Sequence, residues 1–544
     1  MLKKHPKGLL IAFFANMGER FGFYTMMGIL VYYLMAKYGM SGTEAGKIYS
    51  GFYGAIYGLA LVGGIIADRT KNFKGVIGVG LITMLAGYIF MAVPGLNLTF
   101  TIGALAVIAL GNGLFKGNLQ AVVGQLYDDP KYSHLRDSAF SIFYMGINIG
   151  ALFAPTVASS TINWFIKKEG FIRNDELPSL IHQFQDKTLE STSQLQSIAD
   201  NMMGSHVDLT QFCNDYLTAY SSAFNWAFGV AGGMMIFSFI IYMVFKHKLP
   251  DVQVKTTENG EVAEMSKEET KQRLIALFLV FATVIFFWMA FHQNGLTMTM
   301  FAKDFTVQEV GPGTYLVFNI WSLLTIVAGI LSLRSIIINR NDLKNQLVSI
   351  AVLIASCIGI YLFYINNDLV NAFSPELFQH FNPTMIVFLT PIIVGYFAWL
   401  NKRGKEPSAP RKIGYGMLIT AIGFAILLIG SLHLGTLADA QANTEHARVG
   451  TGWLIGTYFT LTIAELFLSP MGLSFVSKVS PPKYQGIMQG AWLGATAVGN
   501  LLLGVGSYMY DKFEIWQVWA VFIVLCLIAA SFIFSIMKKI ERFE

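Results

Sequence analysis

Two full charges lie near the centre of an apolar segment at the start of the chain. The polar and aromatic residues of this segment recur at helical spacing: Asn16, Glu19, Arg20, Phe23, Tyr24 and Met27. The segment is long enough to cross a bilayer. An ionisable residue at membrane depth costs roughly 2.5–3.5 kcal/mol on insertion scales, so it marks a candidate substrate or ion pathway. This pattern therefore predicts ligand or proton binding within a membrane.

Few other charges fall deep inside apolar segments. Lys116 lies in the fourth segment and Glu465 in the twelfth, and Lys116 is flanked by three amides, Asn112, Asn118 and Gln120. The deep residues give the first half of the chain a net charge of about +1 and the second half about −1. A zwitterionic ligand fits between halves so charged, with its carboxylate near Arg20 and Lys116 and its ammonium near Glu465. A structural ion pair is the alternative role for these charges.

The size of the ligand follows from the distance between the two poles. A cavity between two six-helix halves is about 10 Å across, and an extended chain covers about 3.3–3.6 Å per residue, so a di- or tripeptide bridges the poles. Asn148 and Asn382 can bind peptide amides. The aromatic residues that can line side-chain pockets are Tyr24, Tyr32, Tyr57, Tyr144, Trp288 and Trp492. For each of them, membrane packing or an interfacial belt is the alternative.

The composition places the chain among polytopic membrane proteins. Of its 544 residues, 54% are hydrophobic and 13% charged, and the mean hydropathy is +0.53, which is more apolar surface than one soluble core encloses. The net charge of +5 comes from Lys and Arg at segment ends, so no nucleic-acid partner is implied. The three cysteines have neither metal-ligand spacing nor a disulfide framework, and we expect no cofactor. The first segment lacks the features of a cleaved signal and is expected to be retained.

Runs of about 20 apolar residues predict roughly fourteen membrane helices. They lie near residues 8–36, 46–67, 73–94, 99–127, 137–159, 222–246, 272–300, 313–337, 346–366, 376–400, 411–434, 451–477, 484–509 and 513–537. An even number of helices places both termini on the same side of the membrane. Because successive helices cross in opposite directions, the basic clusters fall on that side too. These clusters are Lys3, Lys4 and Lys7; Arg69, Lys71 and Lys74; Lys246 and Lys248; Lys402, Arg403, Lys405, Arg411 and Lys412; and Lys538, Lys539 and Arg542. The sequence therefore predicts a cell membrane protein, in a plasma or bacterial inner membrane, with both termini in the cytoplasm.

Two polar stretches and a helix pair divide the chain. The external stretch 160–221 is expected to form a small exposed cap or partly ordered loop, with a functional lid as the alternative. The segments near 313–337 and 346–366 carry few buried polar groups and are expected to form an accessory hairpin outside a twelve-helix core. The predicted divisions are helices 1 to 5 of the first bundle (1–159), the insertion (160–221), helix 6 (222–248), a cytoplasmic linker (249–271), helix 7 (272–312), the accessory pair (313–366) and the rest of the second bundle (367–544).

Four motifs carry a resemblance to a known family. They are Asn-Met-Gly-Glu-Arg-Phe-Gly-Phe-Tyr at 16–24, Gly-Gly-Ile-Ile-Ala-Asp-Arg at 63–69, Phe-Tyr-Met-Gly-Ile-Asn-Ile-Gly at 143–150 and Glu-Leu-Phe-Leu-Ser-Pro at 465–470. With them the sequence resembles the proton-coupled oligopeptide transporters, a branch of the major facilitator superfamily. The resemblance covers nearly the whole chain outside 160–221 and the accessory pair. It implies an all-α membrane fold of two six-helix bundles, and alternating access around a site that binds di- and tripeptides and protons.

The resemblance also implies a role for each residue. Arg20 and Lys116 are expected near the peptide carboxylate, and Glu465 near the amino terminus. Asn148 and Asn382 are expected on the peptide backbone, and Tyr24, Tyr57 and Trp492 in the side-chain pocket, to which the aromatic pattern adds Trp288. In proton coupling, protonation of Glu19 is expected to free Arg20 and Lys116 for the substrate. At the cytoplasmic turn, Asp68 and Arg69 are expected to act in gating.

Three positions depart from the family pattern. Asn16 replaces a glutamate, Met27 replaces an arginine, and His292 replaces an acid in the seventh helix. In relatives the last two pair as an external latch, so outward closure here is expected to rely on another contact. We hypothesise that His292 titrates in place of the missing acid, because an imidazole has an ordinary pKa near 6.5. A neutral hydrogen-bonding residue is the alternative.

Other classes of function stay open at this point. A related transporter for another small zwitterion or anion, such as an amino-acid conjugate or nitrate, would share the same body, as would a membrane sensor that transports nothing. The sequence argues against a membrane-embedded enzyme, since it contains no clustered metal ligands and no nucleophile elbow. Its few dispersed charges do not form the repeated polar rings of a channel. We expect a monomer in the lipid bilayer.

Overall fold

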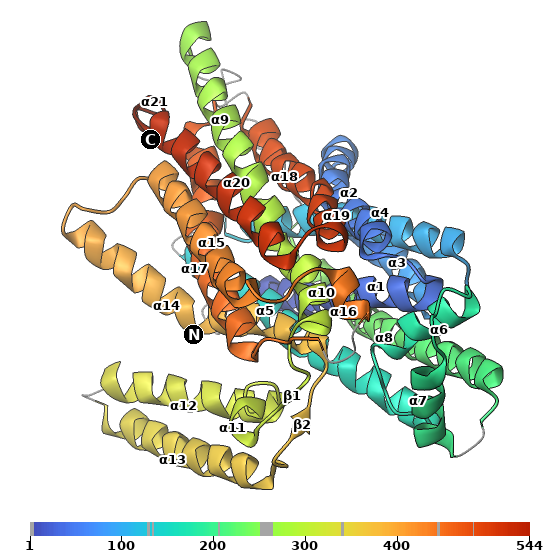
Figure 1. Ribbon diagram of the computed structural model, residues 1–544. Helices are drawn as coiled ribbons and strands as arrows, with labels where there is room; N and C mark the ends of the chain where they lie inside the picture. Colours follow the sequence, from blue (N-terminus) through green and yellow to red (C-terminus); the bar gives the residue numbers. More distant parts are fainter. Residues whose placement is uncertain are drawn as a thin grey trace.

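The computed structural model describes residues 5–127, 131–132, 135–204, 207–250, 265–338, 342–442, 446–481 and 484–543. Within these residues the chain is almost entirely helical, as Figure 1 shows. The first part contains α1 (Lys7–Tyr38), α2 (Gly42–Thr70), α3 (Phe73–Ala92), α4 (Leu98–Gln125), α5 (Arg136–Lys168), α6 (Leu177–Gln185), α7 (Ser193–Met203), α8 (Leu209–Phe245) and the 3-10 helix η3 (Lys246–Lys248).

The second part follows the linker. It contains α9 (Lys267–Phe291), η4 (His292–Gly295), α10 (Thr297–Asp304), β1 (Glu309–Val310), α11 (Pro312–Tyr315), α12 (Ile320–Ile338), α13 (Leu343–Asn366), β2 (Asn371–Ala372), η5 (Pro375–His380), α14 (Phe381–Lys402), α15 (Ala409–Ser431), α16 (Leu437–Ala442), α17 (Thr451–Val479), α18 (Gln485–Leu501), α19 (Gly504–Lys512), α20 (Ile515–Ser535) and α21 (Met537–Glu541). The two strands pair antiparallel, with Glu309 opposite Ala372.

The membrane helices correspond to the fourteen apolar segments. Twelve segments of the described chain are long and apolar enough to cross a membrane. The other two are α1, which contains Glu19 and Arg20, and the pair α18 and α19, which has 17 and 9 residues and is interrupted between them. A helix satisfies its backbone hydrogen bonds internally, and this is why apolar segments in lipid adopt it.

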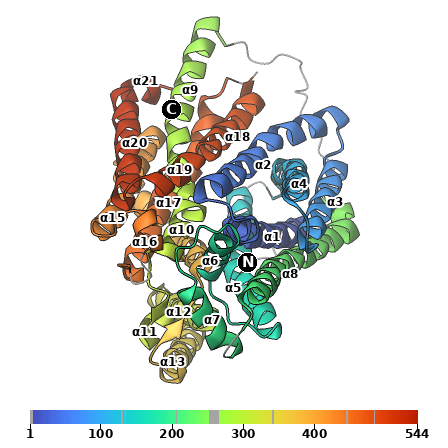
Figure 2. The same cartoon turned by 45° about the vertical axis from the view of Figure 1, so that its right-hand side comes forward.

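The core helices form two bundles that lie side by side (Figure 2). In the first, α1 packs on α5 and α8, α2 on α4, and α3 on α4 and α8. In the second, α9 packs on α18 and α20, α15 on α17 and α20, and α14 on α17. The bundles meet where α2 contacts α18 and α19, and where α5 contacts α14 and η5. The expected major facilitator-type core of two bundles with an accessory hairpin is confirmed.

Glycines set the closest helix crossings. A Cβ on Gly63 in α2 would lie 2.1 Å from the Gly113 carbonyl oxygen in α4, and one on Gly150 in α5 would lie 2.6 Å from the Met17 carbonyl oxygen in α1. Neither crossing leaves room for a side chain, so the small residues let the backbones touch. The neighbouring Gly64 meets nothing within 4 Å. The second crossing presses α5 against α1 at the level of Arg20.

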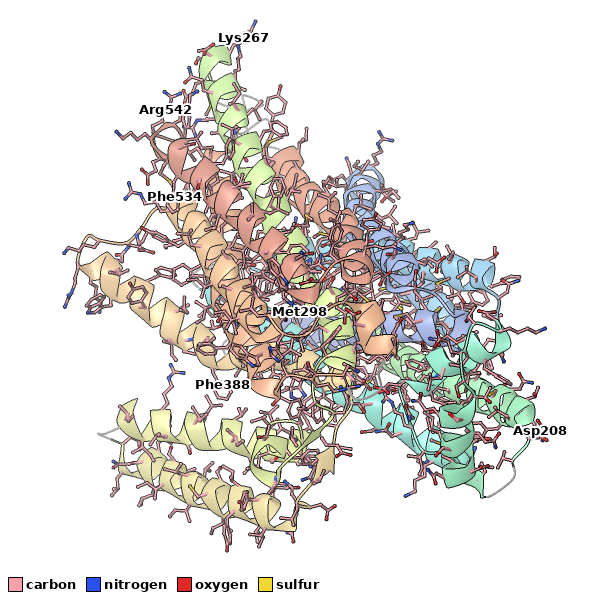
Figure 3. The ribbon with its side chains drawn as sticks, in the orientation of Figure 1. Asp208, Lys267, Met298, Phe388, Phe534 and Arg542 are labelled. Carbon is pink, nitrogen blue, oxygen red and sulfur yellow. The ribbon has the colours of Figure 1, made fainter. Side chains whose placement is uncertain are left out.

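The seventh membrane helix is broken after its first 25 residues. Helix α9 ends at Phe291, and the polar residues of η4 separate it from α10. The Gln293 side chain donates to the Met289 and Leu503 carbonyl oxygens, at 3.1 and 3.2 Å, and the Asn294 carbonyl oxygen accepts from the Tyr458 hydroxyl at 2.9 Å. These bonds satisfy groups that the break would otherwise leave unpaired. The break lies at the centre of the molecule, beside Met298 in Figure 3.

The external insertion is more ordered than the composition suggested. Helix α5 continues to Lys168 and α8 begins at Leu209, so regular helix occupies both ends of the predicted 160–221 stretch. The reason is aromatic packing: Trp164 and Phe165 on α5 contact Trp226 on α8, with ring centroids 6.2 and 5.8 Å apart. Between them, α6 and α7 lie against α8.

The accessory hairpin lies outside the bundles. Helices α12 and α13 pack on each other, and Figure 1 shows them apart from the core, connected to it through β1 and β2. The start of α12 touches α5, where Ile320 and Leu323 cluster with Leu152. Only 11% of the most apolar window of α13 is buried. Most of its side chains are therefore available to lipid.

Candidate functional site

A buried charge network lies on the first bundle, where α1 crosses α4. Both side-chain oxygens of Glu19 accept from Arg20, at 2.5 and 2.6 Å, and Glu19 also accepts from Asn112 on α4 at 2.6 Å. Glu19 and Arg20 are 1% and 4% exposed. The Arg20 guanidinium also lies over the Phe23 ring, 4.7 Å from its centroid. In this conformation both carboxylate oxygens of Glu19 are bonded to Arg20.

Lys116 lies beside this network. Its ammonium group is 3.7 Å from the centroid of the Tyr57 ring on α2, and it is close enough to Glu19 and Arg20 to interact electrostatically with both. Contact with an aromatic face stabilises a cation where water is scarce. The structure therefore brings Glu19, Arg20, Lys116 and Tyr57 together as one cluster.

His292 extends the cluster to the second bundle. Its ring stacks on Trp288 at a centroid distance of 4.8 Å and lies 4.6 Å from Tyr53 of the first bundle. Its Nδ1 is 2.5 Å from the Asn500 Oδ1 on α18. The Trp288 indole N–H is buried and forms no hydrogen bond with the described residues. Buried donors are rarely left without a partner, so this group favours a water or ligand atom nearby.

The opposite pole is a single carboxylate on α17. Glu465 accepts from the Asn382 side chain on α14 at 2.9 Å, and Asn382 also donates to the Thr462 hydroxyl at 3.1 Å. Asn382 lines a small cavity of about 50 Å³ between the bundles, which is also lined by Tyr24, Ala151, Pro155, Asn294, Gln379, Pro383 and Tyr458. Tyr24 interacts electrostatically with both Arg20 and Glu465. Tyr24 and Asn382, which each interact with a pole residue, therefore line the same cavity.

Other predicted residues lie further from this centre. Asn148 is half-buried on α5, one turn from the cavity residue Ala151, and its amide donates to the Tyr144 carbonyl oxygen at 3.0 Å. The Tyr32 hydroxyl bonds the Thr299 carbonyl oxygen at 2.6 Å, across the bundle interface. Asn118 has a structural role, since its amide bonds the Gly63 carbonyl oxygen at 3.1 Å.

Trp492 lies apart from the two poles. Its ring packs on Gly472 of α17, where an added Cβ would be 1.9 Å away, and on Phe281, with ring centroids 6.1 Å apart. Gly472 is about two turns along α17 from Glu465. Only 4% of Trp492 is exposed. Its place in the substrate pocket stays a prediction.

The predicted gate residues Asp68 and Arg69 lie at the exposed end of α2. Neither forms a hydrogen bond or an ion pair with the described residues. Lys71 follows them in a left-handed conformation, with φ of 51°, and ends the helix. The pair is therefore available to contact another element when the bundles move.

Several residues that lie at the cavity or contact His292 were not predicted from the sequence. Asn294, Gln379, Tyr458 and Asn500 lie at the cavity or on His292. The polar run His292-Gln293-Asn294-Gly295 inside an apolar segment is the signal that could have indicated Asn294, because polar residues break a membrane helix where it lines a cavity. Tyr458 carries no such signal, since its neighbours along the chain are ordinary for a membrane helix.

Comparisons with known proteins identify the family of the chain. A model of the POT family matches residues 74–257 and 350–522, which is more than half of the chain. The chain belongs to the POT family. Its similarity to curated proteins extends over most of its length: the dipeptide and tripeptide permease A of Cronobacter turicensis is 25% identical over 521 residues, covering 92% of this chain and 84% of that protein.

Other relatives have similar sequence identity and coverage. The dipeptide and tripeptide permease A of Escherichia coli is 23% identical over 519 residues, covering 92% of this chain and 84% of that protein. Among solved structures, a peptide transporter POT in complex with sulfate has a TM-score of 0.67 at 20% identity, covering 99% of this chain and 96% of that one. A POT family transporter in complex with 5-aminolevulinic acid has a TM-score of 0.66 at 19% identity, covering 99% and 97%. These structures have the same fold as this POT chain.

Proposed function

We propose that this chain is a secondary active transporter that imports di- and tripeptides by proton symport through alternating access. The relatives named dipeptide and tripeptide permease indicate the substrate class. The observation that carries the proposal is the position of Tyr24, which interacts electrostatically with both Arg20 and Glu465 and lines a cavity between the bundles together with Asn382. A dipeptide has a carboxylate at one end and an ammonium group at the other, and opposite charges of this kind can bind both.

The network around Glu19 supplies a route for proton coupling. Protonation of Glu19 removes the charge that Arg20 binds, so Arg20 and the neighbouring Lys116 become available to a peptide carboxylate. Proton binding and substrate binding then favour each other through one set of charges. We propose His292 as a second proton site, because its ring joins this network to the second bundle. Protons are the coupling ion, and no further cofactor is proposed.

The orientation of the chain in the membrane is proposed from the position of its basic residues and from the contacts between the bundles. Lys267, at the start of α9, and Arg542, near the end of the described chain, lie at the same end of the molecule in Figure 3, away from Asp208, and we place that basic end in the cytoplasm of the cell. Cross-bundle hydrogen bonds lie toward the insertion, for example from Thr43 N to Asp511 Oδ2 at 2.6 Å and from Arg173 Nη1 to Glu376 Oε1 at 2.8 Å. We therefore assign this conformation as closed toward the outside. A monomer suffices for this mechanism.

Uptake into proteoliposomes tests the function. Labelled dialanine should accumulate when the outside is acidified from about pH 7.5 to 5.5, and a protonophore should abolish the accumulation. The Glu19→Gln variant should still exchange labelled dialanine in counterflow but should not concentrate it, because the coupling carboxylate is lost. Accumulation by Glu19→Gln at the wild-type level would contradict the coupling scheme. Counterflow of alanine or nitrate without dialanine would instead assign the chain to another substrate.

A further inference from the structure

One ion pair joins the external insertion to the residues that follow the accessory hairpin. Arg173 belongs to the insertion that follows α5 of the first bundle, and Glu376 lies in η5, directly after the hairpin, in the second bundle. We propose that the insertion and the hairpin together form the outer latch of the transporter, and that Arg173 and Glu376 are its lock. They are positioning residues that hold the bundles together and do not touch the substrate.

The contact between the two residues is bidentate and buried. Arg173 Nη1 donates to Glu376 Oε1 at 2.8 Å, and Nη2 donates to Oε2 at 3.1 Å. The side chains are 9% and 0% exposed. Paired hydrogen bonds between guanidinium and carboxylate are strong and directional, and breaking such a buried pair leaves an uncompensated charge. The bundles can separate at this end only after the pair breaks.

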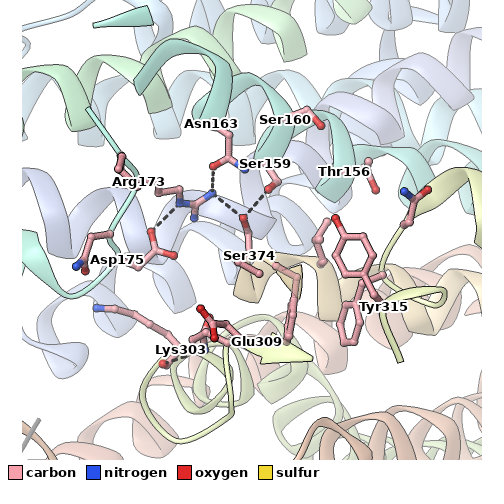
Figure 4. A pocket seen from close by; sticks show the side chains of 18 of the residues that line it. Thr156, Ser159, Ser160, Asn163, Arg173, Asp175, Lys303, Glu309, Tyr315 and Ser374 are labelled. Carbon is pink, nitrogen blue, oxygen red and sulfur yellow. Dashed lines mark hydrogen bonds and ion pairs between the residues drawn. The ribbon is translucent and has the colours of Figure 1, made fainter. Parts of the chain in front are cut away.

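Neighbouring groups fix both partners. Arg173 Nη1 also donates to Ser374 Oγ at 3.1 Å, and Ser159 on α5 bonds the same Ser374 oxygen at 2.8 Å (Figure 4). Arg173 Nε donates to Asp175 at 2.7 Å within the insertion. A second tie crosses the bundles nearby, where Arg448, before α17, bonds Glu176. The lock is therefore the centre of a small network and not an isolated pair.

The hairpin holds Glu376 in place. The strand β2 pairs with β1, and the residue that follows it, Phe373, donates its N–H to the Gln308 carbonyl oxygen at 3.1 Å. The Phe373 ring stacks on Phe318, at the entrance to α12, with centroids 4.1 Å apart. The chain from the hairpin to Glu376 is thus fixed over consecutive residues. This gives the accessory helices a function in closure.

A cavity marks where the two segments come together. It has a volume of about 870 Å³ and is lined by α5, the insertion around Arg173, the residues that precede α12, and β2 with Ser374. Its walls come from both bundles, as Figure 4 shows for Ser159 and Arg173 of the first bundle and Ser374 of the second. Opening of the outer side would separate these walls.

The distance between the two segments tests the latch. Spin labels at Lys187→Cys in the insertion and Asp368→Cys before β2 report it by double electron–electron resonance, since both positions are exposed. The background lacks the native cysteines, Cys213, Cys357 and Cys526. In Glu376→Gln, which keeps the shape of the side chain but removes its charge, the population with the longer distance should rise by about threefold or more. An unchanged distribution would overturn the proposal.

Asp175→Asn is the matched control. It removes a hydrogen-bonded carboxylate from the same arginine, but the contact lies within one bundle, so the long-distance population should rise clearly less than in Glu376→Gln. An equal rise in Asp175→Asn and Glu376→Gln would show general loosening of the insertion and would overturn the latch. The double variant Arg173→Gln/Glu376→Gln should open no more than Glu376→Gln alone, since the two charges act as one unit, and additive opening would contradict the pairing.

A second variant covers the case in which Glu376→Gln fails to fold. Arg448→Gln removes the outer tie to Glu176, which is only partly buried, and should raise the long-distance population by a smaller factor. No rise in this variant would count against the network. The inference rests on the alternating movement proposed above, but the distances need no substrate. A chain that opens as expected yet does not carry dialanine would refute the substrate and leave the latch in place.

Discussion

At the scale of single residues, the site is built from very few charges. Glu19 holds Arg20 in a bidentate pair, Lys116 lies over Tyr57, and Glu465 is bonded to Asn382. Each charge has a neutral or opposite partner, as buried charges require. None of these partners is a substrate, so binding must exchange one set of contacts for another.

Glu465→Gln should weaken binding of peptides that have a free amino terminus. The variant keeps the hydrogen bond to Asn382 but removes the negative charge that the ammonium group needs. A charged hydrogen bond contributes about 1.5–3 kcal/mol, so the dissociation constant for dialanine should rise roughly 10- to 150-fold. Isothermal titration in detergent measures this rise. Amino-acetylated dialanine is the control, and its affinity should not change. An equal loss for both ligands would contradict the assignment.

His292→Gln should flatten the dependence of uptake on external pH between about 5.5 and 7.5, because the variant removes the proposed second proton site. Glutamine can still bond Asn500, so the fold should survive. Initial rates of dialanine uptake give the profile. His380→Gln is the control, since His380 is a buried histidine that bonds the Val317 carbonyl oxygen away from the site. A wild-type profile in His292→Gln would leave that residue a neutral hydrogen-bonding role.

At the scale of the elements, close crossings and breaks position the site. Gly150 lets α5 touch α1 beside Arg20, and the break at η4 turns His292 and Asn294 toward the interface. Gly63 lets α2, which carries Tyr57, reach α4, which carries Lys116. The contact between Lys116 and Tyr57 therefore depends on glycines several residues away.

Gly63→Ala should destabilise the first bundle. Its Cβ would meet the Gly113 carbonyl oxygen at 2.1 Å, so the backbones must separate, at a cost of about 1–3 kcal/mol. The adjacent Gly64→Ala is the control, because nothing lies within 4 Å of its Cβ. Loss of a flexible glycine from a helix should leave that variant equal to or more stable than the wild type. Thermal unfolding in detergent compares them, and equal midpoints for both variants would contradict the crossing.

Asp175→Asn should lower the thermal midpoint by an amount that does not change between about pH 5 and 8. Burial by itself would raise the pKa of Asp175, but the charge and hydrogen bond of Arg173 and a hydrogen bond from Tyr220 hold that pKa below its ordinary value of 3.8. A carboxyl with a depressed native pKa stabilises the fold above its unfolded pKa, and the contribution is lost only as pH falls through the native pKa. A penalty that fades between pH 7 and 5 would show that Asp175 titrates in that range.

At the scale of the whole molecule, two bundles turn about one site and are closed at one end. The closure of the described residues includes the Arg173 lock and the contact of Asp511 with the start of α2. The other end carries the exposed Asp68 and Arg69. Transport requires that the contacts at the two ends form and break in alternation.

Asp68→Asn should slow transport without changing affinity. The residue lies at the end of α2, far along the helix from Tyr57, and the gating hypothesis gives it a contact in only one state of the cycle. The maximal uptake rate should fall by about tenfold while the dissociation constant for dialanine stays the same. Asp186→Asn, on an exposed position of the insertion, is the control. A large loss of affinity at normal rates would assign Asp68 to substrate binding instead.

The residue types alone determined much of this protein. Apolar length predicted the fourteen membrane segments, because lipid admits only helices that satisfy their own backbone. The rarity of charges in such segments singled out Glu19, Arg20, Lys116 and Glu465, since each is too costly to keep without a role. Motif resemblance then indicated the POT family. These signals depend on residues that are close together in the sequence, so they can be recognised without the tertiary structure.

Only the tertiary structure decided which residues meet. Trp492 shares the aromatic character of Trp288, but one packs on Gly472 and the other on His292. Arg173 and Glu376 are separated by 203 positions in the sequence and look like ordinary surface charges there, yet the fold buries them against each other. Pairing across so many residues depends on how the bundles, the insertion and the hairpin pack, and no periodicity along the chain encodes it.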